Sequence, residues 1–289
     1  MRTPAETRAG AIRLAGGRTL AYTELGDLDG APVLYCHGGL SSSGDIGFAH
    51  GAFAQRGLRV IAPDRPGTGD STRHMPRRVA DWAADAAGLC DVLGVGEFAA
   101  LGWSAGGPYA LACGAGLGPR VRLVATVGGM APLGGDVRAA QLGLAADRLL
   151  FPMARRASAA ARAVVWASTH APVRVLHRQL VKHLPPADEA VVAAMTPTEA
   201  TADLTHAVRR GCGGVVDDYV VLGAEWGFAL EDVTCPVAVL QGAQDTLLPM
   251  AHARALAGGL PTGELVVVPE AGHFLLHTAT GTVLDRLAG

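Results

Sequence analysis

The stretch that decides the fold runs from residue 98 to residue 113 and reads FAALGWSAGGPYALAC. Its apolar start, Phe98–Leu101, predicts a buried strand, and its end, Pro108–Cys113, predicts a helix. Between them the glycines around Ser104 permit a sharp turn, in which strand and helix approach closely and the serine is held in a strained backbone conformation. A serine in such a strand–turn–helix setting is typical of a catalytic nucleophile. The alternative is a glycine-rich turn with an idle serine.

Short apolar runs recur along the chain, and each ends in glycine, proline or polar residues. An N-terminal hairpin is predicted at 11–14 and 19–24, and further strands at 32–36, 58–62, 98–102, 121–127, 237–241 and 264–269. Runs without clean alternation are expected for parallel strands that are covered on both faces. Helices are predicted at 79–93, 108–114 and 280–287. This order favours an α/β fold with a mostly parallel, twisted sheet and helices on both faces.

The interval 131–232 breaks this rhythm. It holds Ala/Arg-rich helical segments punctuated by prolines and has no credible strand. A helical insertion of this length between two sheet strands predicts a cap over the carboxyl edge of the sheet, inserted after the sixth strand. The expected domains are an α/β core at 1–130 and 233–289 and a helical cap, or lid, at 131–232.

Length and composition exclude several classes of protein. The 289 residues suit one α/β domain or two small ones, and 49% apolar against 17% charged residues excludes intrinsic disorder. With 24 basic and 26 acidic side chains the net charge is −2, so no nucleic-acid partner is expected. The uncharged stretch 98–119 is long enough to span a bilayer. Its glycines and proline divide it into strand, turn and helix, so we expect buried core and no membrane partner.

The five cysteines form no C-x-x-C pair and mostly sit inside apolar runs. This pattern favours reduced, buried thiols and a cytoplasmic location. Residues 1–10 contain charges but no apolar segment, so no signal peptide is expected. The oligomeric state cannot be read from the sequence.

Residues 136–183 are strongly basic. Seven arginines and Lys182 stand against Asp136 and Asp147, which gives a local net charge of +6. A solvated helix face is one interpretation, and attraction of an anionic substrate or carrier is the other.

Five motifs occur in the order found in the α/β-hydrolase fold, and over nearly its whole length the chain resembles the serine-hydrolase branch of that superfamily. They are His-Gly-Gly (37–39) after the third strand, Asp-Arg-Pro-Gly-Thr-Gly-Asp-Ser (64–71) after the fourth, the serine turn after the fifth, Gly-Ala-Gln-Asp (242–245) after a late strand and Gly-His (272–273) after the last. The resemblance implies a Ser-Asp-His catalytic triad, with Ser104 as the nucleophile.

A serine hydroxyl needs a general base, and of the ten histidines only His273 follows the predicted last strand. The base needs an acid that orients it, and Asp245 lies 28 residues earlier, after the preceding strand. Asp136, just after the sixth strand, is the alternative acid. His277 could form a zinc pair with His273, but no third ligand is obvious, so no metal is expected.

Two N–H donors must stabilise the oxyanion of the tetrahedral intermediate. The backbone N–H of Ala105 follows the nucleophile, and the resemblance implies Gly39 N–H as the second donor, with Leu40 as the second choice. Leu40 and Trp103 are expected to contact substrate, although Trp103 could equally pack in the core. His37 is expected to brace its loop by hydrogen bonds.

These features predict a cofactor-independent serine hydrolase that cleaves a small or medium ester, thioester or lactone through an acyl-enzyme on Ser104. The partner is a small-molecule substrate with an acyl group. A carbon–carbon bond hydrolase, a perhydrolase or a biosynthetic cyclase would use the same triad. A ligand-binding receptor on a hydrolase fold is an alternative of a different class.

Overall fold

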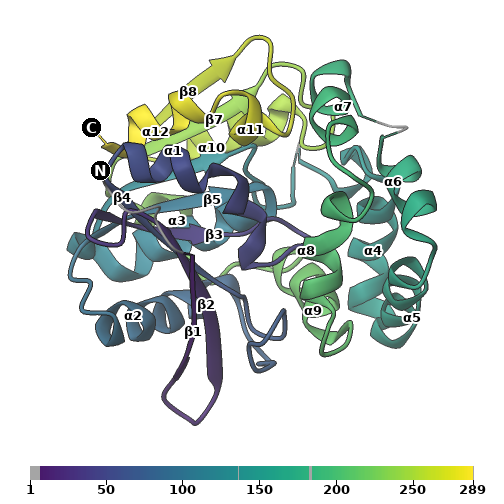
Figure 1. Cartoon of the computed structure of the whole chain (residues 1–289), viewed down its shortest axis with the longest axis horizontal. Helices are drawn as coiled ribbons and strands as arrows, with labels where there is room; N and C mark the ends of the chain where they lie inside the picture. Colours follow the sequence, from purple (N-terminus) through teal and green to yellow (C-terminus); the bar gives the residue numbers. More distant parts are fainter. Residues whose placement is uncertain (1–6, 136, 182–183, 289) are drawn as a thin grey trace.

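The computed structural model describes residues 7–135, 137–181 and 184–288. Its strands are β1 (Arg8–Arg13), β2 (Thr19–Gly26), β3 (Ala31–Cys36), β4 (Leu58–Pro63), β5 (Phe98–Trp103), β6 (Val121–Val127), β7 (Val237–Gly242) and β8 (Gly263–Val268). They form one eight-stranded sheet in the order β1-β2-β4-β3-β5-β6-β7-β8 (Figure 1).

Most of the sheet is parallel. β1 and β2 form an antiparallel hairpin, and β2 pairs antiparallel with β4. Every pair from β4 through β3, β5, β6 and β7 to β8 is parallel. Because parallel strands end at the same edge, the loops after β3 to β8 emerge together there, where ligands bind in open α/β sheets.

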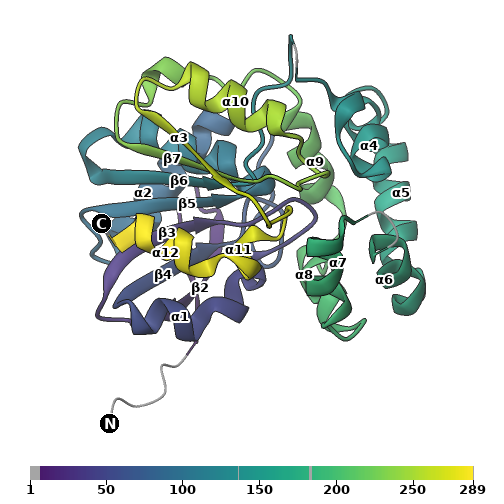
Figure 2. The same cartoon turned by 90° about the horizontal axis from the view of Figure 1, so that it is seen from above.

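Helices cover both faces of the sheet (Figure 2). One face packs against α1 (His50–Gln55), α11 (Leu275–Thr278) and α12 (Thr280–Ala288), and the other against α2 (Trp82–Val92), α3 (Gly107–Leu117) and α10 (Met250–Gly259). Successive β3 side chains alternate between two buried clusters, with Val33 in one and Leu34 in the other. Covering on both faces explains why the central strands are continuous apolar runs.

The segment between β6 and β7 is helical. It contains α4 (Ala145–Arg156), α5 (Ser158–Thr169), α6 (Val173–Val181), α7 (Pro186–Ala193), α8 (Glu199–Ala207) and α9 (Gly213–Leu222). Figures 1 and 2 show α4 to α7 grouped to one side of the sheet. We call residues 131–232 the insertion.

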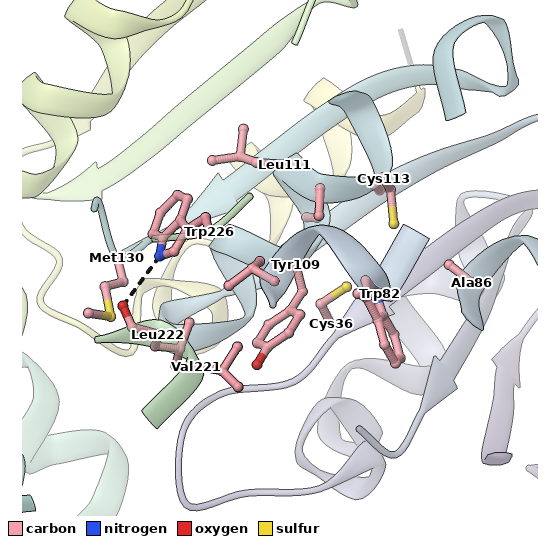
Figure 3. Close-up of a cluster of buried hydrophobic side chains, with 14 of the residues drawn as sticks. Cys36, Trp82, Ala86, Tyr109, Leu111, Cys113, Met130, Val221, Leu222 and Trp226 are labelled. Atoms are coloured by element: carbon pink, nitrogen blue, oxygen red, sulfur yellow. Dashed lines mark hydrogen bonds between the residues drawn. The ribbon is translucent and has the colours of Figure 1, made fainter. Parts of the chain in front are cut away.

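The last helix of the insertion is anchored in the core. Val221 and Leu222 of α9 lie in the same buried cluster as Tyr109 of α3 and Met130 (Figure 3). The Trp226 indole N–H donates a hydrogen bond to the Leu222 carbonyl over 3.3 Å. The insertion therefore rejoins the sheet through a packed apolar contact.

The predicted fold class is confirmed, and the predicted strands after the hairpin match within about one residue. The hairpin strands are longer than predicted, and the helix expected at 79–93 begins with a 3₁₀ turn, Val79–Asp81, before α2. Helices α1 and α10 were not predicted from the sequence. No helix in the described ranges is long and apolar enough to cross a membrane, and stretch 98–119 forms β5, a turn and α3. The division into core and cap stays a prediction.

Candidate active site

Ser104 lies in a strained turn between β5 and α3. Its φ is +55°, in the left-handed region that side chains other than glycine rarely adopt. Gly106 explains how the turn fits, because a β-carbon there would lie only 1.9 Å from the carbonyl oxygen of Cys36. The strand before the turn is fully buried, whereas Ser104 is partly exposed. This geometry presents the hydroxyl at the carboxyl edge of the sheet.

His273 and Asp245 form a buried pair on the loops that follow β8 and β7. His273 Nδ1 lies 2.9 Å from Asp245 Oδ2. The other carboxylate oxygen, Oδ1, accepts the backbone N–H groups of Leu247 and Leu248 at 2.9 Å each. Because an ionised carboxylate can only accept hydrogen bonds, Nδ1 bears the proton, which leaves His273 Nε2 as the basic nitrogen.

The charge around His273 favours its protonated form. Burial is the largest influence and lowers the imidazole pKa, but the carboxylates of Asp245, Asp188 and Asp147 together outweigh burial, so the net pKa of His273 is raised. A histidine with such a pKa can take up a proton and return it near neutral pH.

Several contacts bring the loops of His273 and Ser104 together. The Trp103 indole N–H donates to the backbone carbonyl of His273 over 3.1 Å. Ser104 O accepts the N–H of Met130 over 3.1 Å, and a β-carbon on nearby Gly128 would lie 3.2 Å from both His273 Nδ1 and the Asp245 carboxylate. The three residues expected to form the triad therefore gather at one edge of the sheet.

The loop after β3 lies against the residue that follows the serine. A β-carbon on Gly39 would be 3.4 Å from the Ala105 β-carbon, and Gly39 is exposed. Leu40, like Ser104, has a left-handed backbone, with φ +54°. Such strain concentrates at functional sites. Trp103 is 8% exposed and packs in the core, so its hydrogen bond to His273 O favours the packing interpretation.

His37 braces this loop as expected. Its Nδ1 donates to Gly38 O over 3.0 Å, and its Nε2 accepts the N–H of Arg65 over 3.2 Å. Burial, reinforced by the Arg65 charge, lowers the pKa of His37 to about 3, so the ring is neutral. The Arg65 guanidinium also donates to the carbonyls of His37 and Gly38. These bonds fix the backbone just before Gly39.

Asp218 of α9 connects the insertion to Arg65. Its carboxylate accepts Arg65 Nε at 2.8 Å, Arg77 Nη2 at 2.6 Å and the Tyr109 hydroxyl at 3.0 Å. Burial raises the pKa of Asp218, but the two arginines outweigh burial and hold it below its usual value. A charge of the insertion thus compensates the buried guanidinium that binds the loop after β3.

Asp45 also orients the loop after β3. Its Oδ2 accepts the N–H of Gly38 at 3.0 Å and the Ser41 hydroxyl at 2.8 Å. Burial, followed by the negative charge of Asp203, raises the Asp45 pKa to about 7.

Four residues that contact the candidate site were not predicted from the sequence: Asp45, Asp188, Asp218 and Gln241. Gln241 Nε2 donates to Asp245 Oδ2 over 3.0 Å, and a polar residue at the end of an apolar strand was a usable signal for it. The acids of the insertion gave no such signal, because their partners are far away in sequence.

Two expectations concern other residues. Asp136, the alternative acid, lies outside the described residues. His277 stacks on Phe48 with ring centroids 3.5 Å apart, and burial lowers its pKa to about 4. Within the described ranges, no three His, Cys, Asp or Glu side chains are grouped so as to hold a metal ion. Cys36, Cys90, Cys113 and Cys212 are buried free thiols, and Cys235 is half-buried.

The basic segment 136–183 contributes arginines to a surface hollow of about 980 Å³, namely Arg138, Arg148, Arg155 and Arg156. Arg148 donates to the carbonyls of Leu142 and Gly143, and Arg155 donates to Gly223 O over 2.8 Å. Part of this charge therefore fixes the backbone of the insertion. Lys182 and Asp136 lie outside the described residues.

Comparisons with known proteins agree with this fold. Residues 31–280 match the family described as the alpha/beta hydrolase fold. A dihydrolipoyllysine-residue acetyltransferase component of an acetoin cleaving system from Pseudomonas putida is 28% identical over 286 residues, which are 94% of this chain and 66% of that protein. A pimeloyl-[acyl-carrier protein] methyl ester esterase from Aromatoleum aromaticum is 42% identical over 62 residues, which are 21% of this chain and 25% of that protein.

The chain thus spans less than two thirds of the length of these curated relatives. Among solved structures, the enol-lactonase from Burkholderia xenovorans LB400 has a TM-score of 0.73 at 18% identity and covers 97% of this chain and 100% of its own. That likeness shows the fold. Since the family match covers most of the chain, the protein belongs to the α/β-hydrolase fold family.

Proposed function

We propose that the protein is a cofactor-independent serine hydrolase that cleaves a small or medium ester, thioester or lactone through an acyl-enzyme on Ser104. One observation supports this most strongly: the left-handed Ser104 directly follows Trp103, whose indole N–H binds the backbone carbonyl of His273, and His273 is paired with the buried Asp245. A strained, partly exposed serine beside an oriented histidine is the arrangement that nucleophilic catalysis requires.

In the first step His273 Nε2 accepts the hydroxyl proton of Ser104, and Oγ attacks the substrate carbonyl carbon. The C=O π electrons move to the oxygen, where the N–H groups of Gly39 and Ala105 stabilise the oxyanion. Asp245 stabilises the imidazolium through the 2.9 Å hydrogen bond to Nδ1.

In the second step the tetrahedral intermediate collapses. The bond to the leaving alcohol or thiol breaks, and the His273 imidazolium gives its proton to that group. Water then adds to the acyl carbon of the Ser104 ester while His273 removes a proton from it. Collapse of this second intermediate releases the carboxylic acid and restores the serine hydroxyl.

We propose that the insertion is the cap of this site. Asp188 of α7 contacts the His273 loop and Asp218 of α9 contacts Arg65, so the insertion meets loops at the carboxyl edge. A helical cover there would set the size of the acyl pocket and limit water access. The ester-cleaving relative from Aromatoleum supports an acyl substrate.

Labelling with a fluorophosphonate probe tests this function directly. Wild-type protein is compared with Ser104→Ala and with Ser168→Ala, the same change at an exposed serine on α5. We expect labelling of the wild type and of Ser168→Ala, no labelling of Ser104→Ala, and loss of p-nitrophenyl ester turnover in Ser104→Ala alone. The three proteins should have the same circular dichroism spectrum.

Unlabelled, folded wild-type protein with no turnover of any p-nitrophenyl ester would refute the proposal and would favour the receptor alternative. Equal labelling of Ser104→Ala would assign the reactive nucleophile to another residue. Burst release of p-nitrophenol followed by steady turnover would support the acyl-enzyme, since a receptor that reacts once would stop after the burst.

A further inference from the structure

A carboxylate of the insertion grips the backbone of the loop that contains His273. Asp188 lies at the start of α7 and is completely buried. Its Oδ2 accepts the N–H of His273 over 2.7 Å, and its Oδ1 accepts the N–H of Phe274 over 2.8 Å. Both oxygens of one side chain therefore orient two consecutive peptide groups, in bonds strengthened by the charge.

The residue before His273 is shaped to admit this carboxylate. A β-carbon on Gly272 would lie 2.4 Å from the carboxyl carbon and from both oxygens of Asp188. The backbone of Gly272 is not in the left-handed region, so glycine is required here by the close approach of Asp188 and not by conformation. The loop and the insertion thus fit each other at this point.

On its other side the same peptide is fixed by the core. His273 O accepts the Trp103 indole N–H over 3.1 Å, and its ring is bound to Asp245. The residue is therefore held at three places: its N–H by the insertion, its carbonyl by β5 and its Nδ1 by the loop after β7. Of these three supports, only Asp188 comes from the insertion.

We propose that Asp188 is a positioning residue that couples docking of the insertion to the alignment of His273 for proton transfer. This inference rests on the proposed serine-hydrolase function. Proton transfer between Ser104 and His273 depends on sub-ångström placement of the two side chains. Releasing the His273 loop from α7 should therefore lower kcat and change substrate binding little.

The negative charge of Asp188 gives a readout, the pKa of His273, that would not shift if Asp188 had a purely structural role. The charged and titratable groups that act on His273 are Asp245 after β7, Asp188 on α7, Asp147 on α4 and His252 on α10. Burial opposes protonation of His273, whereas the three carboxylates raise its pKa. Removing the Asp188 charge therefore lowers that pKa and shifts the acid limb of kcat/KM, where His273 loses its proton, to lower pH.

The test compares Asp188→Asn with Asp217→Asn. Asp217 is buried like Asp188 but lies on α9, where it accepts two hydrogen bonds from Arg73 of the core, one of them 2.8 Å long. This variant therefore tests the loss of a contact between insertion and core that does not involve His273. For Asp188→Asn we expect kcat for a p-nitrophenyl ester to fall roughly 10²-fold, with KM changed less than threefold and the acid limb moved to lower pH. Asp217→Asn should keep the wild-type kcat and acid limb.

Equal losses of kcat in both variants would overturn the proposal, since they would reflect docking of the insertion alone. A kcat for Asp188→Asn within threefold of the wild type, with an unmoved acid limb, would overturn it as well. If Asp188→Asn fails to fold, hydrogen exchange of the wild type decides: the amides of His273 and Phe274 should be protected, and fast exchange of both would refute the contact. Failure of the serine-hydrolase function would appear separately, as wild-type protein that neither labels nor turns over.

Discussion

Replacing Asp245 by asparagine tests the assignment of the acid. Four N–H donors surround this carboxylate: His273 Nδ1 and Gln241 Nε2 at Oδ2, and the backbone of Leu247 and Leu248 at Oδ1. The backbone N–H groups of Leu247 and Leu248 cannot turn away, so the side-chain oxygen of the asparagine must face them. Its NH₂ group then faces His273 Nδ1 and Gln241.

This arrangement forces the imidazole into the other tautomer. Nδ1 becomes an acceptor for the new NH₂ group, and Nε2 bears the proton and cannot take one from Ser104. We expect kcat to fall about 10⁴-fold, equivalent to about 5.4 kcal/mol of transition-state stabilisation. Since Asp245 is buried behind His273 and proposed to act through it, KM should change little.

The assay is steady-state hydrolysis of a p-nitrophenyl ester by the wild type and Asp245→Asn from pH 6 to 9. Asp285→Asn serves as the matched control, because this exposed carboxylate on α12 pairs only with Arg56 among the contacts described. NMR titration of His273 adds an independent readout. Loss of the Asp245 charge should lower the imidazole pKa, since that carboxylate is the largest influence opposing burial.

Asp245 is not the acid that orients His273 if folded Asp245→Asn keeps more than a tenth of the wild-type kcat. In that case the acid would have to be sought elsewhere, and Asp136→Asn would be the next variant to measure. An unchanged imidazole pKa would equally contradict the geometry, because the 2.9 Å hydrogen bond could not then exist in solution.

Three further predictions concern stability. Gly106→Ala should lower the free energy of unfolding by about 3 kcal/mol, because its β-carbon meets the Cys36 carbonyl oxygen at 1.9 Å, and an unchanged urea midpoint would contradict the tight turn. Asp218→Asn should cost about 3–5 kcal/mol in the same assay, because it leaves two buried guanidinium groups uncompensated, and a loss below about 1 kcal/mol would count against this network. Burial raises the Asp45 pKa from 3.8 to about 7, so the folded state binds an extra proton and the wild type loses stability as pH rises from about 4 to 7, by up to ~1.4 kcal/mol per pH unit. Asp45→Asn should flatten this slope, and an unchanged pH profile of unfolding would refute it.

The local parts of the site could be predicted from the sequence. Ser104 lies in a turn whose glycines are next to it in the chain, and each of Asp245 and His273 directly follows a strand that its apolar run reveals. Strand order in a parallel sheet then brings the three loops to one edge. Short helices such as α1 and α10 were missed because small residues give them little amphipathic pattern.

The contacts that orient these residues depend on tertiary packing that no local pattern encodes. Asp188 lies 85 residues from His273, and Asp218 lies 153 residues from Arg65. Asp188 lies in the first turn of α7, where an acidic residue is usually explained by the helix itself. Asp218 lies within the largely buried helix α9, and periodicity gives no reason to assign its carboxylate to a distant arginine.

Asp188 and Asp218 together connect the insertion to two separate loops of the candidate site. Asp188 contacts the loop of the proposed base, and Asp218 holds the arginine that grips the carbonyls of His37 and Gly38, just before the proposed oxyanion donor. The insertion therefore binds the loops on both sides of Ser104, whereas the serine turn itself is fixed by its own glycines. Movement of the insertion would therefore misalign the proposed base and the proposed oxyanion donor together and leave Ser104 in place. If the insertion is the proposed cap, sequence changes that reshape the acyl pocket must keep both carboxylates in position.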